Sequence, residues 1–213
     1  MTPEERQQVV EQRRALGYPL HAPPHPNRDE GRYLITAANF EHALIMASPQ
    51  RLTEFEARLL DALAGIEATV YAWVILPNHY HVLLAVLTLN QISDALQELH
   101  GKTSREWNLA DGRTGQRKVW YKFSDRWIRN DRHFYRALNY IHANPVKHGY
   151  VASPYDWPWS SLERYVEHQG REWLQETWKK YPPDRFGRGW DDAPSLNCPP
   201  LDSDGFSRPT SNG

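Results

Sequence analysis

The segment from residue 68 to residue 86 constrains the fold most, because it predicts two strands joined by a two-residue turn. Both halves, ATVYAWVIL (68–76) and HYHVLLAV (79–86), are rich in β-branched and aromatic residues. Only Pro77 and Asn78 separate them. Proline fixes φ and asparagine tolerates a left-handed backbone, so this pair suits a tight turn. The segment therefore predicts a β-hairpin within an antiparallel sheet.

Further elements surround this hairpin and define the fold class. In chain order they are a strand at 31–39, a helix at 48–65 capped by Ser48 and ended by Gly65, the hairpin, a helix at 90–108, two short β segments within 117–130, a helix at 131–144 that Pro145 ends, and a last helix starting near Ser160-Ser161. This order predicts an α+β fold in which helices pack on one antiparallel sheet.

Composition divides the chain of 213 residues into three parts. Residues 1–30 start as a charged segment and break up in LHAPPHPNRDEG, so we expect an N-terminal arm. Residues 31–181 carry the predicted elements and are long enough for one compact domain. Residues 182–213 are dominated by Pro, Gly, Asp and Ser, which predicts a disordered tail.

Cysteine content and hydropathy bear on the compartment. Cys198 is the single cysteine, which excludes an internal disulfide framework and fits a reducing environment. The first residues, MTPEERQQVVEQRRALGY, lack the apolar stretch of a signal peptide, and no segment has the length to span a bilayer. We therefore expect a soluble cytoplasmic protein.

The net charge of −1 hides an uneven distribution. Residues 101–190 hold 17 basic and 10 acidic residues, a net charge of +7, whereas residues 1–100 hold 7 and 12 and residues 191–213 hold 1 and 4. A basic middle favours a polyanionic partner, with an ordinary solvated surface as the alternative. Four aromatic residues interleave with the basic ones: Trp120, Tyr121, Phe123 and Trp127. They suit stacking on nucleic-acid bases, and the alternative for the two tryptophans is a place in the core.

His79 and His81 stand one residue apart in the second strand of the predicted hairpin. Side chains alternate along a strand, so both imidazoles lie on one face, about 7 Å apart. Two imidazoles at this spacing can share a metal ion if a third ligand reaches them from another element. The alternative is a hydrogen-bonded histidine pair at the mouth of a strand, because a His-x-His tripeptide alone is a weak signal in a chain with ten histidines.

The helix expected at 131–144 offers that third ligand. On a helical wheel His133, Arg136, Ala137 and Asn144 fall within about 60° of Tyr140. Tyr140 and Asn144 are four residues apart and are therefore neighbours on one face. A phenol would lie beside an amide oxygen that is able to ligate a hard cation. For Tyr140 alone, an amphipathic packing role is the alternative.

Three stretches in this order resemble the HUH single-tyrosine transposases, and within them the branch of REP-associated tyrosine transposases. They are AWVILPNHYHVLL, RKVWYKFSDRWIRNDRHFYRALNYIHANPVKHGYV and DWPWSSLERYV. The resemblance covers roughly residues 31 to 166, and YIHANPVKHG followed by DWPWSS is its most specific part. It implies a ferredoxin-like (RRM-like) domain, with His79 and His81 as metal ligands, Tyr140 as the nucleophile and Asn144 completing the metal site.

The resemblance also implies an activity, namely metal-dependent cleavage and rejoining of hairpin-forming single-stranded DNA through a 5′-phosphotyrosine intermediate. The implied partners are REP-like palindromes, and the implied cofactor is Mg²⁺ or Mn²⁺. DNA-binding residues are expected in the basic segment: Lys102, Arg105, Lys122, Arg126, Arg129 and Arg136.

Two other functions remain open at the level of sequence. The first is a domesticated, non-catalytic nucleic-acid-binding protein, which the presence of His79, His81, Tyr140 and Asn144 disfavours. The second is an RNA-binding RRM domain. It is disfavoured because the strand positions that would carry stacking aromatic residues carry the two histidines instead.

Overall fold

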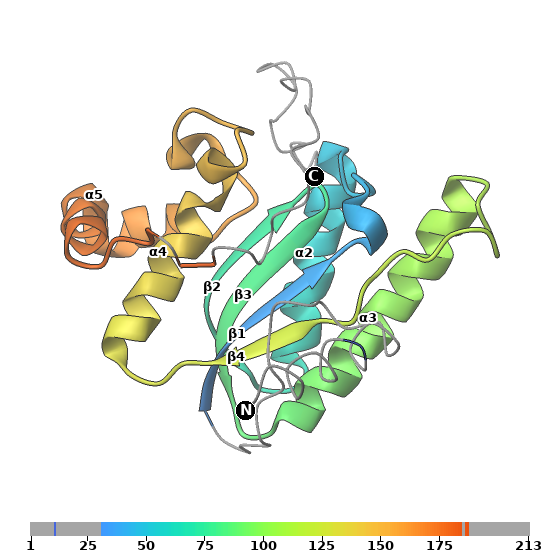
Figure 1. Ribbon diagram of the computed structural model, residues 1–213, viewed down its shortest axis with the longest axis horizontal. Helices are drawn as coiled ribbons and strands as arrows, with labels where there is room; N and C mark the ends of the chain where they lie inside the picture. The colour runs from blue at the N-terminus through green and yellow to red at the C-terminus, as the bar shows by residue number, and fades with distance from the viewer. Residues whose placement is uncertain (1–10, 12–30, 185, 188–213) are drawn as a thin grey trace, which may run out of the picture.

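The computed structural model describes residue 11, residues 31–184 and residues 186–187, and its centre is a four-stranded antiparallel sheet (Figure 1). The strands are β1 (Gly31–Ala38), β2 (Thr69–Leu76), β3 (His79–Val86) and β4 (Ser124–Trp127). Their spatial order is β2-β3-β1-β4. With one helix after β1 and one after β3, this order is that of a ferredoxin-like domain, as the family resemblance implies.

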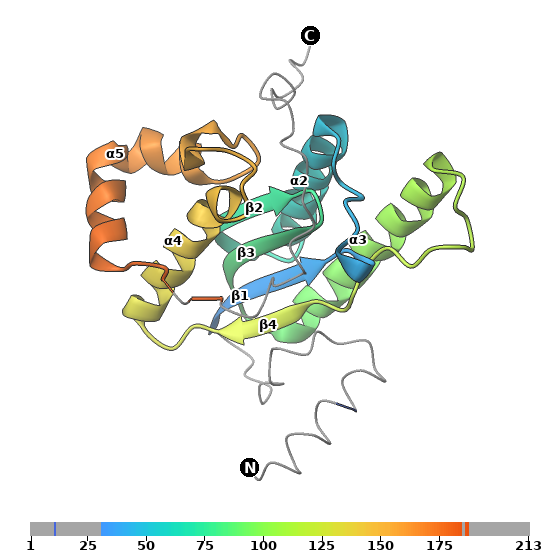
Figure 2. The ribbon, with the colours of Figure 1, turned by 45° about the horizontal axis from the view of Figure 1, so that its top comes forward.

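Helices cover both faces of the sheet (Figures 1 and 2). The helices are α2 (Pro49–Ala64), α3 (Leu89–Ala110), α4 (Asp131–Lys147) and α5 (Leu162–Lys180), with 3-10 turns η1 (Phe40–His42) and η2 (Pro154–Asp156). On one face α2 and α3 pack against the side chains that alternate with the histidine pair. On the other face α4 packs against β2 and β3. In the described part of the chain, none of the helices is long and apolar enough to cross a membrane.

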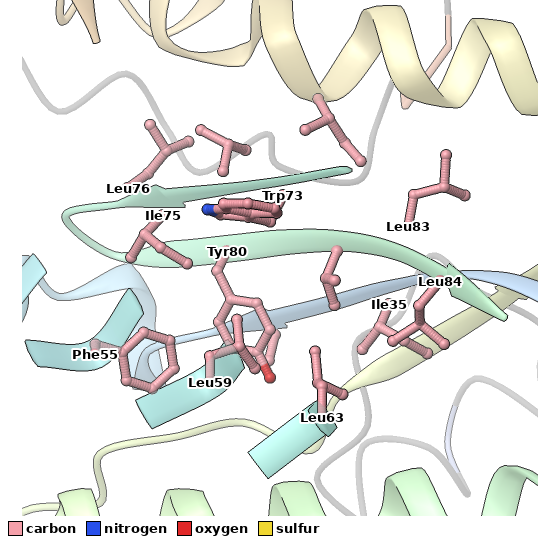
Figure 3. Close-up of a cluster of buried hydrophobic side chains, with 14 of the residues drawn as sticks. Ile35, Phe55, Leu59, Leu63, Trp73, Ile75, Leu76, Tyr80, Leu83 and Leu84 are labelled. Carbon is pink, nitrogen blue, oxygen red and sulfur yellow. The ribbon is translucent and has the colours of Figure 1, made fainter. Parts of the chain in front are cut away.

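The hairpin forms as predicted, and its two faces have different partners. On the α2 face Tyr80 contacts Phe55, with ring centroids 5.2 Å apart. Figure 3 shows Tyr80 beside Phe55 and Leu59, with Leu83 pointing to the opposite side of the hairpin. Because side chains alternate along β3, burying Tyr80 beneath the sheet fixes the histidines on the face above it.

Local signals account for the helix ends. Ser48 accepts a hydrogen bond from the Arg51 amide at 3.2 Å and caps α2, and Gly65 follows its last residue. Asn130 caps α4 by accepting from the His133 amide at 2.8 Å. These caps fix the residues at which α2 and α4 begin.

The segment DWPWSS covers the outer edge of β2. Its backbone bonds to the strand through the Ile75 amide to Trp159 O at 2.9 Å and the Ser161 amide to Trp73 O at 3.0 Å. The Trp157 indole donates to Ile75 O at 3.0 Å. These bonds occupy backbone groups at the edge of β2 that would otherwise be exposed. The edge of β2 is thereby protected from pairing with a strand of another chain.

Two boundaries differ from the sequence prediction. Helix α4 does not end before Pro145 but continues to Lys147. A proline removes one amide donor, and near a helix end that loss is small enough for packing to override it. The expected two β segments within 117–130 are one strand, β4, preceded by an isolated bridge between Asn39 and Trp120.

Two buried histidines are held neutral by the fold. Burial lowers the pKa of His100 to about 3 and that of His142 to about 3. Burial also raises the pKa of Tyr80, so its hydroxyl stays protonated and lies 3.0 Å from His100 Nε2. His142 Nε2 lies 2.9 Å from Ser161 Oγ.

Both histidines have a lower pKa folded than unfolded, so their stabilisation is complete above about pH 6.5 and is lost as the pH falls below that value. We expect the unfolding free energy to drop by about 2 kcal/mol per buried histidine between pH 7 and pH 5. In His142→Gln this drop should shrink by about 2 kcal/mol. Urea unfolding at both pH values measures it, and His168→Gln, at an exposed position of α5, is the control. An unchanged pH dependence in His142→Gln would contradict the account.

Candidate active site

His79 and His81 lie side by side at the start of β3, on the face that α4 covers. Their ring centroids are 5.0 Å apart, and both side chains are buried. His79 Nδ1 is 2.6 Å from Asn78 Oδ1. Because an amide oxygen only accepts, Nδ1 carries the proton and Nε2 carries the lone pair of the neutral ring. His81 Nδ1 is 2.7 Å from Thr36 Oγ1 on β1. Both rings are thus oriented through Nδ1, the arrangement that metal-binding histidines use.

Helix α4 brings Tyr140 and Asn144 over this pair, as the helical spacing predicts. The Tyr140 ring centroid is 5.1 Å from that of His81. Tyr140 is 2% exposed and Asn144 is 0% exposed. The four residues chosen from sequence therefore gather in one buried place, with the phenol beside the His81 imidazole and the amide one turn further along the helix.

Asn144 is the residue whose surroundings point most clearly to a ligand. Within the described part of the chain, neither its Oδ1 nor its Nδ2 has a hydrogen-bond partner, although both atoms are buried. A buried amide without partners costs free energy, and such a group calls for an explanation such as an ion. Two imidazoles and an amide oxygen form a donor set that fits a divalent cation such as Mn²⁺. Among the described residues, no group of three His, Cys, Asp or Glu could hold a metal. The fit therefore depends on Asn144.

His148 also lies at this site, which the sequence analysis did not predict. It follows α4 as its C-terminal cap, and its ring centroid is 4.9 Å from that of His79. The sequence signal that could have identified His148 is its position four residues after Asn144, which places it one helical turn further on the same face.

Three of the six predicted DNA-binding residues cluster beside the site. Arg126 is opposite Leu34, which is opposite Leu83, so the guanidinium starts from the face that carries the histidines. Burial, and then Arg129, lowers the pKa of Arg126 to about 10. Burial, and then Arg126, Arg129 and Arg136, lowers the pKa of His133 to about 4. His133 is therefore neutral at pH 7. The three arginines around it make this end of α4 strongly positive.

Two of the other three predicted DNA-binding residues lie in the layer on the opposite side of the sheet. Lys102 and Arg105 lie on α3, which covers the opposite face of the sheet. Lys102 pairs with Glu98 at 2.6 Å on the helix surface. Lys122 is exposed just before β4. Sequence position placed all six in one basic segment, but the sheet separates that segment into two layers.

Residues 182–184 and 186–187 cross over Tyr140. Asn139 donates to Thr177 O at 3.0 Å and to Tyr181 O at 2.8 Å, so the chain leaves α5 alongside α4. Arg136 donates to Pro182 O at 3.4 Å and to Asp184 O at 3.0 Å. A Cβ on Gly187 would lie 2.5 Å from Tyr140 Cζ, so only glycine fits there.

This crossing was not expected, because 182–213 was assigned to a disordered tail. The Phe186 ring centroid is 5.4 Å from that of Tyr140. On the same helix face, Lys147 Nζ is 5.1 Å from the Tyr140 ring centroid. The expected arm at 1–30, apart from residue 11, and the remainder of the expected tail lie outside the described residues.

Comparisons with known proteins agree with this fold. No protein-family model matches the chain. A REP-associated tyrosine transposase of Escherichia coli is 33% identical over 98 residues, which cover 46% of this chain and 56% of that protein. A protein of Haemophilus influenzae assigned to the same family is 34% identical over 126 residues, 54% of this chain and 71% of that protein. The match to the Escherichia coli relative thus spans little more than half of that relative's length.

A solved structure of a REP-associated tyrosine transposase bound to a REP hairpin shares the fold. The TM-score is 0.56 at 22% sequence identity, over 68% of this chain and 85% of that one. The fold and the site define a ferredoxin-like domain with a histidine pair under a tyrosine-bearing helix. With the sequence match to relatives of that name, the chain belongs to the family of REP-associated tyrosine transposases.

The close approach of Gly187 to Tyr140 leads to a prediction. Gly187→Ala should displace residues 186–187 and expose the Tyr140 ring, so nitration of Tyr140 by tetranitromethane, read by peptide mass spectrometry, should rise. Gly115→Ala is the matched control, because Gly115 has the same φ of +72° but open space around it. Equal nitration of Tyr140 in wild type and Gly187→Ala would show that this contact does not cover the ring.

Proposed function

We propose that this protein is a metal-dependent transposase that cleaves and rejoins hairpin-forming single-stranded DNA through Tyr140. The observation that carries the proposal is the contact of Tyr140 with His81, which lies beside His79, one helical turn before a buried Asn144 amide that has no hydrogen-bond partner among the described residues. The hairpin as substrate is supported by the related transposase whose structure was solved with a REP hairpin.

His79 and His81, through Nε2, and Asn144, through its amide oxygen, would hold a divalent cation, Mg²⁺ or Mn²⁺. When bound, such an ion supplies Lewis-acid polarisation of the scissile phosphate. Two imidazole ligands favour Mn²⁺ over Mg²⁺, which prefers oxygen ligands. Asn78 accepts from His79 Nδ1 and so leaves the lone pair on His79 Nε2, and Thr36 orients the His81 ring through its Nδ1.

Tyr140 supplies the nucleophile. Its hydroxyl oxygen attacks phosphorus, a bond from Tyr140 Oη to phosphorus forms, and the bond to the 3′ oxygen of the preceding nucleotide breaks. The phenolic proton leaves and the 3′ oxygen gains a proton, so the products are a 5′-phosphotyrosine and a free 3′-hydroxyl. Attack of a 3′-hydroxyl on this linkage reverses the reaction and joins DNA without ATP, because the phosphodiester energy is conserved.

The positive groups at the site favour the phenolate and the phosphate. A free phenol has a pKa near 10, so a nearby cation lowers the cost of removing its proton. Lys147 lies over the Tyr140 ring, and Arg126 starts from the same face of the sheet. Arg129 and Arg136 extend the positive surface along α4, where they neutralise backbone phosphates.

DNA reaches Tyr140 only when residues 182–184 and 186–187 move away. Arg136 now binds the carbonyl oxygens of Pro182 and Asp184, and a phosphate oxygen would replace them as the acceptor. The covered ring is also the observation that favours the second candidate, a nucleic-acid-binding protein that does not cleave. Both functions predict DNA binding, and covalent attachment separates them.

The test is adduct formation with a DNA hairpin that carries single-stranded flanks. Wild-type protein with Mn²⁺ should give a protein–DNA adduct that survives a denaturing gel, and a chelator should abolish it. Tyr140→Phe should bind the same DNA in a native gel and give no adduct. Tyr135→Phe, on the same helix but stacked on Tyr181, is the matched control and should keep the adduct. DNA binding by wild type without any adduct would support the non-catalytic function instead.

A further inference from the structure

An aromatic and cationic cluster lies just beyond the end of β1. The rings of Phe40 and Tyr121 are 4.9 Å apart at their centroids and tilted by 43°. Lys118 Nζ lies 4.9 Å from the centroid of Phe40 and 5.7 Å from that of Tyr121. Both rings are partly exposed and Lys118 is exposed. Proteins bind single-stranded nucleic acid with such groups: exposed aromatic rings stack on the bases, and lysines contact the phosphates.

Strand register places this cluster on the same face as the histidine pair. Ala38 is opposite His79, and Phe40 follows Ala38 by two residues. The Tyr121 amide donates to Ala38 O at 2.9 Å. Trp120, the neighbour of Tyr121, points to the other face, where it stacks on His100 with centroids 4.4 Å apart. Of these two neighbouring aromatic residues, only Tyr121 therefore remains on the side of the site.

The backbone just after Phe40 is held in a conformation that its residues rarely adopt. Glu41 has φ of 56° and His42 has φ of 52°, both in the left-handed region although neither is glycine. Such strain persists where surrounding contacts enforce it, and it clusters at functional sites. Here Asn78 Nδ2 donates to His42 O at 3.2 Å.

The same Asn78 orients His79 through its Oδ1. The turn that carries Phe40 is therefore joined by one side chain to a proposed metal ligand. A base resting on the cluster would be held at a fixed distance from the scissile phosphate, which gives the cluster a role in positioning the strand.

We propose that Phe40, Tyr121 and Lys118 form a subsite for one unpaired nucleotide of the DNA strand, on the His79 side of the scissile phosphate. The base packs against the two rings, face-on to one of them because they are tilted by 43°, and Lys118 contacts its phosphate. Arg126, level with Leu83 on β3, lies toward the opposite end of the sheet. The strand thus has a contact on each side of Tyr140. This subsite rests on the proposed function, because its ligand is the DNA that Tyr140 cleaves.

An abasic scan tests the subsite. The probe is a DNA hairpin flanked on both sides by unpaired thymidines, with one base removed at a time. In wild type, removal at one or two positions of a single flank should weaken binding by about 5- to 150-fold, the range for loss of one base–aromatic stack. In Tyr121→Leu the intact probe should bind more weakly by a similar factor, and the position-specific effect should vanish.

Matched variants complete the design. Phe40→Leu should have the same effect as Tyr121→Leu. Agreement between the two variants excludes a folding defect in Tyr121→Leu as the cause. Tyr155→Leu, on η2, removes a ring that also lies by a cation, with Arg171 Cζ 4.6 Å from its centroid, and should keep the wild-type scan. A wild type that binds and cleaves the hairpin, with the same scan in Tyr121→Leu, overturns the subsite alone. A wild type that binds no hairpin overturns the proposed function and the subsite with it.

Discussion

The contact that the rest of the site depends on is the packing of α4 against the β2–β3 hairpin. Ser161 forms its centre, because its Oγ accepts from the Trp73 amide at 3.1 Å and lies 2.9 Å from His142 Nε2. One hydroxyl thereby joins the sheet edge to α4. His142 lies between Tyr140 and Asn144 in the helix, so fixing it sets the height and rotation of both. The buried, neutral state of His142 is thus part of the architecture that holds Tyr140 above the histidines.

Much of the site could be predicted because it follows from two local periodicities. Alternation along a strand puts His79 and His81 on one face, and helical spacing puts Tyr140 and Asn144 together. The turn between β2 and β3 has only two residues, Pro77 and Asn78, so it fixes which residues of the two strands pair. Where a property depends on spacing within a single element, sequence reasoning placed the residues on the faces that the structure shows, with Tyr140 against His81.

Properties that depend on contacts between distant parts of the chain were missed. Pro145 is a local signal for a helix end, and packing of the last turn overrode it. His148 joins His79 only because α4 continues to Lys147. Gly187 lies on Tyr140 because Asn139 ties the end of α5 to α4. The six basic residues looked equivalent in sequence, but the sheet places Lys102 and Arg105 on the opposite layer from Arg126.

We propose that His79, His81 and Asn144 share one divalent cation beneath Tyr140. Substoichiometric Mn²⁺ broadens the NMR signals of nearby protons, so the imidazole C–H signals report on it without any DNA. The account predicts that His79 and His81 broaden well before the buried His100 and His142, and that Asn144→Leu removes this selectivity. Equal broadening of all four histidines, or the same selective broadening in Asn144→Leu, would contradict it.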